Sequence, residues 1–85
     1  MMSYEKVTRA NGHVVIGTKQ TMKALRNGDI KELIIANDAD RHVLDKVLSL
    51  AEENNVPVTG VDSMQKLGKA CGIDVGAATV AIKRS

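Results

Sequence analysis

Four short segments of the chain are apolar at nearly every position, and segments with helical features separate them. The apolar segments cover residues 13–17, 32–36, 58–61 and 78–82. A strand with one face in water alternates apolar and polar residues, whereas a strand covered on both faces is apolar almost throughout. The pattern therefore predicts a central four-stranded sheet with helices on both of its faces.

The helices are predicted from apolar periodicity and from residues that begin or end a helix. Between residues 41 and 53, apolar residues recur at the three-and-four spacing of an amphipathic helix. Thr18 and Ser63 are expected N-caps, and Gly28 and Gly72 are expected to end the helices that follow these caps. With caps included, the predicted helices span residues 3–10, 18–27, 41–53 and 63–71. The alternation predicts an α/β fold, a three-layer α/β/α sandwich around a largely parallel or mixed four-stranded sheet.

The length of 85 residues fits a single domain over residues 1–85. No apolar run approaches the ~20 residues of a membrane span, and the first residues lack the apolar stretch of a signal peptide. Cys71 is the single cysteine, which excludes an internal disulfide and a cysteine-based zinc site. We therefore expect a soluble protein of the reducing cytoplasm.

Aromatic side chains are almost absent, since the chain has one Tyr and neither Phe nor Trp. Proteins that bind single-stranded nucleic acid by stacking bases need several exposed rings. Any nucleic-acid binding by this chain must therefore depend on charge, hydrogen bonds and shape.

The formal net charge of +2 is unevenly distributed along the chain. Residues 1–31 carry six basic and two acidic groups, residues 32–62 carry two and seven, and residues 63–85 carry four and one. Two basic ends therefore flank an acidic middle. If the ends meet in the fold, they form one positive patch that suits a polyanion. If they do not meet, the charges are ordinary solvated faces.

The second predicted helix carries the first candidate site. At about 100° per residue, Lys19, Gln20, Lys23 and Arg26 share one face of this helix. The free N–H groups and the positive end of the helix dipole lie at its start, which favours a phosphate. Gly17 allows a backbone to approach closely at that point. These features fit RNA or phosphate binding, and they also fit a surface helix with ordinary basic residues.

The second candidate site is the loop over residues 73–77, which follows the last predicted helix. Gly72 and Ile73 fit the glycine and the apolar contact of a Schellman cap, which is a structural role. This role explains Val75 less well, because Val75 lies between an acidic residue and a glycine in the loop. We expect Val75 to form a small apolar lip beside the lysines of the preceding helix.

Three features are compatible with an enzyme, and each also has a structural explanation. Asp38 and Asp40 follow a strand and could bind a divalent cation, although such residues more often cap the following helix. His13 and His42 have no partner pattern that indicates catalysis, and Cys71 falls on an apolar helix face. We therefore expect no catalytic residue, no metal site and no cofactor.

Three segments in a fixed order carry a family resemblance: residues 17–23 (GTKQTMK), 33–40 (LIIANDAD) and 67–73 (LGKACGI). In this combination the chain resembles the kink-turn-binding ribosomal protein family. That family includes the archaeal large-subunit protein seven-Ae and the eukaryotic and archaeal protein thirty-e. The resemblance covers nearly the whole chain and is closest to the short bacterial, YbxF-like members. It implies an α/β/α sandwich that binds a kink-turn, a sharp bend in double-stranded RNA formed by a bulge and sheared G·A pairs.

The resemblance also implies two contacts with RNA. The start of one helix enters the widened groove of the bent RNA, where Lys19 and Gln20 occupy base-reading positions and Lys23 reaches a guanine or a phosphate. A neighbouring apolar loop covers the bases extruded at the bulge, with Lys69 as a backbone contact. With the basic helix face included, the expected RNA-binding residues are Gly17, Thr18, Lys19, Gln20, Lys23, Arg26, Lys69, Ile73, Asp74, Val75 and Gly76.

The chain departs from the family pattern at two base-reading positions. Archaeal members commonly have Asn-Glu where this chain has Lys19 and Gln20. A carboxylate accepts two hydrogen bonds from the N–H edge of guanine, whereas Gln offers one acceptor oxygen and an added donor, and Lys only donates. We therefore expect recognition of RNA to persist and to rely more on charge.

The favoured function is an RNA-binding protein that stabilises kink-turns in ribosomal, riboswitch or other non-coding RNA. Two other functions remain open at this point. A protein-interaction adaptor would use the acidic helix at residues 41–53, and a small hydrolase or metal enzyme would be centred on Asp38 and Asp40. We expect a monomer, because the pattern leaves no large apolar face unburied.

Overall fold

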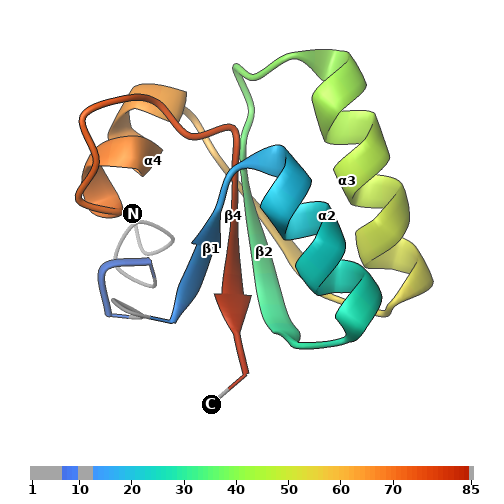
Figure 1. The fold of residues 1–85 in the computed structure, drawn as a ribbon. Helices are drawn as coiled ribbons and strands as arrows, with labels where there is room; N and C mark the ends of the chain where they lie inside the picture. Colours follow the sequence, from blue (N-terminus) through green and yellow to red (C-terminus); the bar gives the residue numbers. More distant parts are fainter. Residues whose placement is uncertain (1–6, 10–12, 85) are drawn as a thin grey trace.

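The structure, a computed structural model, describes residues 7–9 and 13–84. Residues 7–9 are helical, and the predicted helix over residues 3–10 otherwise lies outside the described residues. Figure 1 shows the order of the elements that follow along the chain. They are β1 (Val14–Ile16), α2 (Thr18–Asn27), β2 (Ile30–Ala36), α3 (Arg41–Glu53), β3 (Val58–Val61), α4 (Met64–Ala70) and β4 (Thr79–Lys83). The predicted bounds of α3 and β3 are confirmed, α2 begins one residue earlier than a Thr18 cap predicts, and β2 begins two residues earlier than predicted.

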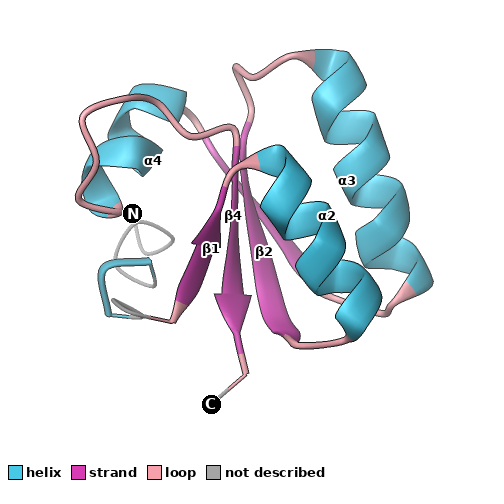
Figure 2. Cartoon of the chain, viewed as in Figure 1, coloured by secondary structure: helices cyan, strands magenta, loops and turns pink. Residues whose placement is uncertain are grey.

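The sheet is mixed, with the strand order β1-β4-β2-β3. β4 lies between β1 and β2 and is antiparallel to both, whereas β2 and β3 are parallel. Figure 2 shows the strands as one central layer. The mixed sheet is confirmed, and the largely parallel alternative is wrong. The reason is that β4 enters the sheet from the edge where β1 and β2 end, so it must run in the opposite direction.

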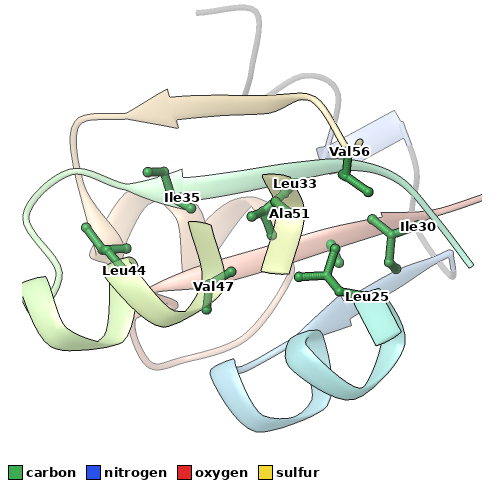
Figure 3. Close-up of a cluster of buried hydrophobic side chains, with 9 residues drawn as sticks. Leu25, Ile30, Leu33, Ile35, Leu44, Val47, Ala51 and Val56 are labelled. Atoms are coloured by element: carbon green, nitrogen blue, oxygen red, sulfur yellow. The ribbon is translucent and has the colours of Figure 1, made fainter. Parts of the chain in front are cut away.

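Two hydrophobic clusters lie on opposite faces of the sheet, because successive side chains of a strand point to opposite sides. In β2, Leu33 and Ile35 face a cluster with α2 and α3, where Leu25 and Val47 are fully buried. Figure 3 shows this cluster between the sheet and the two helices. Ile34 and Ala36 face the other cluster, which includes Leu67 of α4 and Val7. The predicted α/β/α layering is confirmed.

The topology brings several loops to one edge of the sheet, called the loop edge below. The carboxyl ends of β1, β2 and β3 all lie at this edge, and β4 begins there. The loop edge therefore comprises residues 16–18, 37–40, 62–63 and 77–79 (Figure 1). Helices α2, α3 and α4 all start there.

Within residues 7–9 and 13–84, no helix is long and apolar enough to cross a lipid bilayer.

Candidate nucleic-acid interface

The start of α2 has no side-chain cap. Gly17 occupies the N-cap position with φ 100° and ψ 148°, and no side chain accepts a hydrogen bond from the first turn. The predicted N-cap Thr18 is wrong by one residue. The first helical hydrogen bond runs from Thr21 N–H to the carbonyl oxygen of Gly17 at 2.9 Å, which makes Thr18 the first helical residue. A positive φ of this size favours glycine, which explains the shift.

The backbone at this helix start is open to a ligand. The first N–H groups of a helix have no partner within the helix, and here they belong to Thr18, Lys19 and Gln20. The space beside Gly17 is empty within 4 Å of the place where a Cβ would lie. The first turn of α2 contains no acidic residue. An acceptor atom of a phosphate or a base can therefore reach these N–H groups.

Two contacts fix the start of α2 to the start of β4. Gly17 N–H donates to the carbonyl oxygen of Thr79 at 3.2 Å. The hydroxyl of Thr79 donates to the hydroxyl of Thr21 at 3.4 Å, and both residues are fully buried. Sequence reasoning did not single out Thr21 for this role. The sequence signal that could have identified Thr21 is its place four positions before Leu25, which puts a polar residue on the helix face that packs on the sheet.

The basic face of α2 is confirmed as a solvent-exposed surface. Lys19, Gln20, Lys23 and Arg26 are all exposed, while Leu25 is buried. The three cations form no ion pair with the described residues, whose ion pairs join Arg41 to Asp45 and Lys66 to Asp62. Lys19 and Lys23 therefore leave positive charge next to the open helix start. Arg26 lies about 12 Å along the helix axis from Thr18, at 1.5 Å per residue.

The loop over residues 73–77 begins with the predicted Schellman cap of α4. Gly72 has φ 80°. Its N–H donates to the carbonyl oxygen of Lys69 at 3.0 Å, and Ile73 N–H donates to that of Gly68 at 3.1 Å. Ile73 is half-buried and packs against the cluster on this face of the sheet. Its side chain therefore belongs largely to the cap, as the structural interpretation of Ile73 predicted.

Val75 is the most exposed large apolar side chain among the described residues, at 69% of its full accessibility. Its neighbours Asp74 and Gly76 are also exposed. The far end of the loop is held by a hydrogen bond from Ala77 N–H to the carbonyl oxygen of Met64 at 3.0 Å. The loop is thus tied down on both sides of Val75, while the Val75 side chain points into solvent.

The two candidate segments adjoin at the loop edge. Thr79, which accepts the hydrogen bond from Gly17, follows the loop over residues 73–77 by two residues. Figure 1 shows this loop running from α4 to the top of β4, beside the start of α2. The fold therefore joins parts of the two basic ends of the chain, although α2 and the loop are about 50 residues apart in sequence. Lys69 is exposed on the last turn of α4.

Asp38 and Asp40 both accept hydrogen bonds from helix N–H groups. Asp40 Oδ1 accepts from His42 N–H at 2.8 Å, so Asp40 caps α3 as predicted. Asp38 was expected to cap the same helix, and that expectation is wrong: its Oδ1 accepts from Met64 N–H, the first residue of α4, at 2.9 Å. The described residues hold no group of three or more His, Cys, Asp and Glu side chains placed to bind a metal ion.

The remaining candidates for enzyme chemistry have ordinary surroundings. His13 and His42 are exposed. Cys71 is half-buried against the cluster beside α4, and this burial raises the pKa of its thiol. A raised pKa leaves the thiol protonated and unreactive, which agrees with the predicted role of Cys71 as a small apolar residue.

The fold and the site together define a class of protein: a small α/β/α sandwich in which an uncapped basic helix start adjoins an exposed apolar loop. Residues 1–85 match the model of the Ribosomal protein L7Ae/L30e/S12e/Gadd45 family. The chain belongs to this family, which confirms the resemblance seen in its sequence.

Relatives in two further comparisons agree with this family. The RNA-binding protein YbxF of Geobacillus stearothermophilus is 63% identical over 83 residues, which cover 98% of this chain and 100% of the relative. An RNA-binding protein of Bacillus pumilus is 56% identical over 81 residues, covering 95% and 98%. These relatives bear RNA-binding names, in keeping with the expectation that the chain is not an enzyme.

Solved structures with the same fold include two that carry different descriptions. The 15.5kD RNA binding protein of Giardia lamblia matches with a TM-score of 0.80 and 25% identity, over 93% of this chain and 68% of that one. A protein of unknown function from Bacillus halodurans matches with a TM-score of 0.83 and 28% identity, over 96% and 81%.

Proposed function

We propose that this chain binds structured RNA and recognises kink-turns, with the start of α2 and the loop over residues 73–77 as its two contacts. The main observation behind the proposal is that the start of α2 and the loop over residues 73–77 adjoin at the loop edge. There an uncapped helix start, whose Lys19 and Lys23 form no ion pair with the described residues, lies next to a loop that hydrogen bonds hold on both sides of the exposed Val75. Family membership and the RNA-binding names of the relatives support the RNA part of the proposal.

The chemistry of the helix start suits an RNA groove. The N–H groups of Thr18, Lys19 and Gln20 are donors that a phosphate or a base edge can use. Gly17 leaves room for a nucleotide to lie close to the backbone. Lys19 and Gln20 extend from this point as side chains that can read base edges, and Lys23 follows one turn later on the same exposed face.

The loop suits the second feature of a kink-turn, its extruded bases. An unstacked base loses contact with its neighbours, and an apolar surface can cover it. Val75 offers such a surface, and its exposure in the free protein costs little because a single exposed apolar residue is normal. The absence of aromatic stacking platforms fits recognition of RNA shape rather than of single strands.

The proposed action on RNA is a shift of a conformational equilibrium. A kink brings phosphates together at an electrostatic cost, and a basic protein that binds only the bent form raises the population of that form. No bond is made or broken. The protein would thus act as a folding clamp for structured RNA.

The test is a titration of a duplex that contains a kink-turn and is labelled at both ends for energy transfer. The matched RNA control has Watson–Crick pairs in place of the sheared G·A pairs. We expect tight binding and approach of the two ends only with the kink-turn duplex. Equal, weak and salt-sensitive binding to both duplexes would contradict specific recognition and would favour the protein-interaction adaptor.

A pair of protein variants tests which surface binds the RNA. Lys19→Ala combined with Lys23→Ala should weaken binding, because both lysines lie at the proposed contact. The control is Lys31→Ala combined with Lys46→Ala, which removes the same charge from two exposed positions on β2 and α3. An equal loss in both double variants would mean that binding depends on net charge alone.

We also propose that the protein is a cytoplasmic monomer. Among the described residues, the exposed large apolar side chains are Val58, at 38%, and Val75, at 69%. They lie on different elements, so neither forms a patch of the size that subunit interfaces bury. Sedimentation equilibrium of the free protein measures the oligomeric state, and a dimer at micromolar concentration would contradict this part.

A further inference from the structure

The loop over residues 73–77 lies directly on the backbone of α4 at Gly68. Gly68 is buried. A Cβ at this position would overlap the carbonyl oxygen of Val75, and it would lie 3.0 Å from the carbonyl carbon of Val75 and 3.2 Å from Cα of Gly76. These neighbours are backbone atoms, which cannot rotate away as a flexible side chain can. The loop holds its place only because residue 68 has no side chain.

A second contact holds the loop at the start of α4. Ala77 N–H donates to the carbonyl oxygen of Met64. At Gly76 a Cβ would lie 3.2 Å from the Cβ of Met64, so a side chain at this position would crowd the start of α4. Met64 is itself fixed by the carboxylate of Asp38, which accepts its N–H at 2.9 Å. Asp38 is thereby connected to the loop through Met64.

Together these contacts make α4 a rigid support for the backbone on both sides of Val75. We propose that Gly68 and Asp38 are positioning residues that preform the loop over residues 73–77 as an RNA-binding surface. The role in RNA binding rests on the proposed function, whereas the role in holding the loop does not. A loop that is already ordered in the free protein loses little conformational entropy on binding, so its displacement should weaken binding without removing any contacting side chain.

Gly68→Ala tests the main contact. Alanine is the better helix former, so helix propensity alone predicts no harm from this change. We expect the loop to move off α4, and the affinity for a kink-turn duplex to fall by about tenfold. The amide protons of Ile73 and Ala77, which are bonded to Gly68 and Met64, should exchange with solvent faster than in the unchanged protein.

Gly28→Ala is the matched control. Gly28 has φ 76° at the end of α2, with nothing within 4 Å of a Cβ. The substitution strains the backbone and lowers stability, but it touches neither the loop nor α4. We therefore expect unchanged exchange at Ile73 and Ala77 and unchanged affinity. If Gly28→Ala weakens RNA binding as much as Gly68→Ala at equal loss of stability, the positioning role is wrong.

The pair Asp38→Ala and Asp40→Ala tests the second contact and keeps the proposal testable if Gly68→Ala does not fold. Both changes remove one exposed carboxylate that caps a helix, but only Asp38 caps the helix under the loop. Asp38→Ala should speed exchange at Ala77 and weaken RNA binding, Asp40→Ala should do neither, and Asp38→Asn, which keeps an acceptor oxygen, should restore both. Equal effects of the two alanine variants would overturn the role of Asp38.

The hydrogen-exchange measurement separates this inference from the proposed function. If the unchanged protein binds both duplexes equally, kink-turn recognition is wrong, and exchange at Ile73 and Ala77 still decides whether Gly68 holds the loop. If the protein selects the kink-turn and Gly68→Ala leaves exchange and affinity unchanged, the positioning role is wrong and the proposed function stands.

Discussion

Truncation of Val75 to alanine should weaken RNA binding while leaving the folded protein intact. Val75 is 69% exposed in the free protein, so most of its apolar surface is available for a base to cover. Complete burial of a valine side chain contributes about 1.5 kcal/mol at the low end of the usual range. The exposed share of Val75 corresponds to about 1 kcal/mol, or about a fivefold increase in Kd for Val75→Ala.

Val75→Asp should have a larger effect on the same contact. The substitution removes the apolar contribution of the valine side chain and adds repulsion between the new carboxylate and nearby phosphates. This repulsion is about 0.8 kcal/mol for two charges 5 Å apart in water. The total of about 2 kcal/mol corresponds to about a 25-fold increase in Kd. Neither substitution should change the free energy of unfolding by more than about 0.5 kcal/mol, because the side chain is exposed and has no partner to lose.

The assay is the energy-transfer titration with the kink-turn duplex, run beside thermal melting of each free variant. Val75→Thr is the control for shape, because Thr keeps the branched side chain and exchanges one methyl group for a hydroxyl. Its Kd should lie between that of the unchanged protein and that of Val75→Ala. The reasoning is refuted if both Val75→Ala and Val75→Asp bind with unchanged Kd, or if their loss of affinity merely follows a loss of melting temperature.

Three further predictions concern salt, a helix cap and the thiol. Affinity for the kink-turn duplex should fall as KCl rises. Lys19→Ala combined with Lys23→Ala should reduce the slope of log K against log salt by about 1–2, since each phosphate contact contributes about 0.9 in duplex DNA. An equally steep slope in the double variant would contradict contact by these lysines. Asp40→Ala should cost about 1 kcal/mol of stability through the lost cap of α3 and lower Tm by about 4–8 °C, as calorimetry would show. Burial raises the pKa of the Cys71 thiol in the folded state, so the unfolded chain loses this proton at a lower pH. The free energy of unfolding should therefore decline as pH rises through the ordinary thiol range. In denaturant titrations at several pH values, Cys71→Ala should lack this part of the decline.

Local signals were enough to predict most element boundaries to within one residue. Asp40 before α3 and Pro57 before β3 mark helix and strand starts, and both elements have the predicted bounds. Gly72 ends α4 in a Schellman motif, as its place in the sequence indicated. These features depend on residues within one or two turns of each other, so the sequence near each boundary is sufficient to predict them.

The candidate site was predictable in part. The exposed basic face of α2 follows from helical periodicity, since Lys19 and Lys23 share one side of a helix and Leu25 points to another. The uncapped start was not predicted, because a threonine next to a glycine also fits an N-cap. The choice between Gly17 and Thr18 depended on the positive φ that the chain needs where it leaves β1 and bonds to Thr79.

Apolar periodicity and the cap and turn residues were sufficient to predict the layers of the fold and the exposed basic face of α2. These features depend on interactions between near neighbours in sequence. The antiparallel insertion of β4, the hydrogen bond from Met64 to Asp38 and the packing of Val75 on Gly68 required the folded chain. Asp38 and Met64 are 26 residues apart, and no local pattern indicates which of several nearby N–H groups a carboxylate will reach. Contacts of this kind depend on how whole helices and strands pack, so they become definite only when the sheet and both helix layers are assembled.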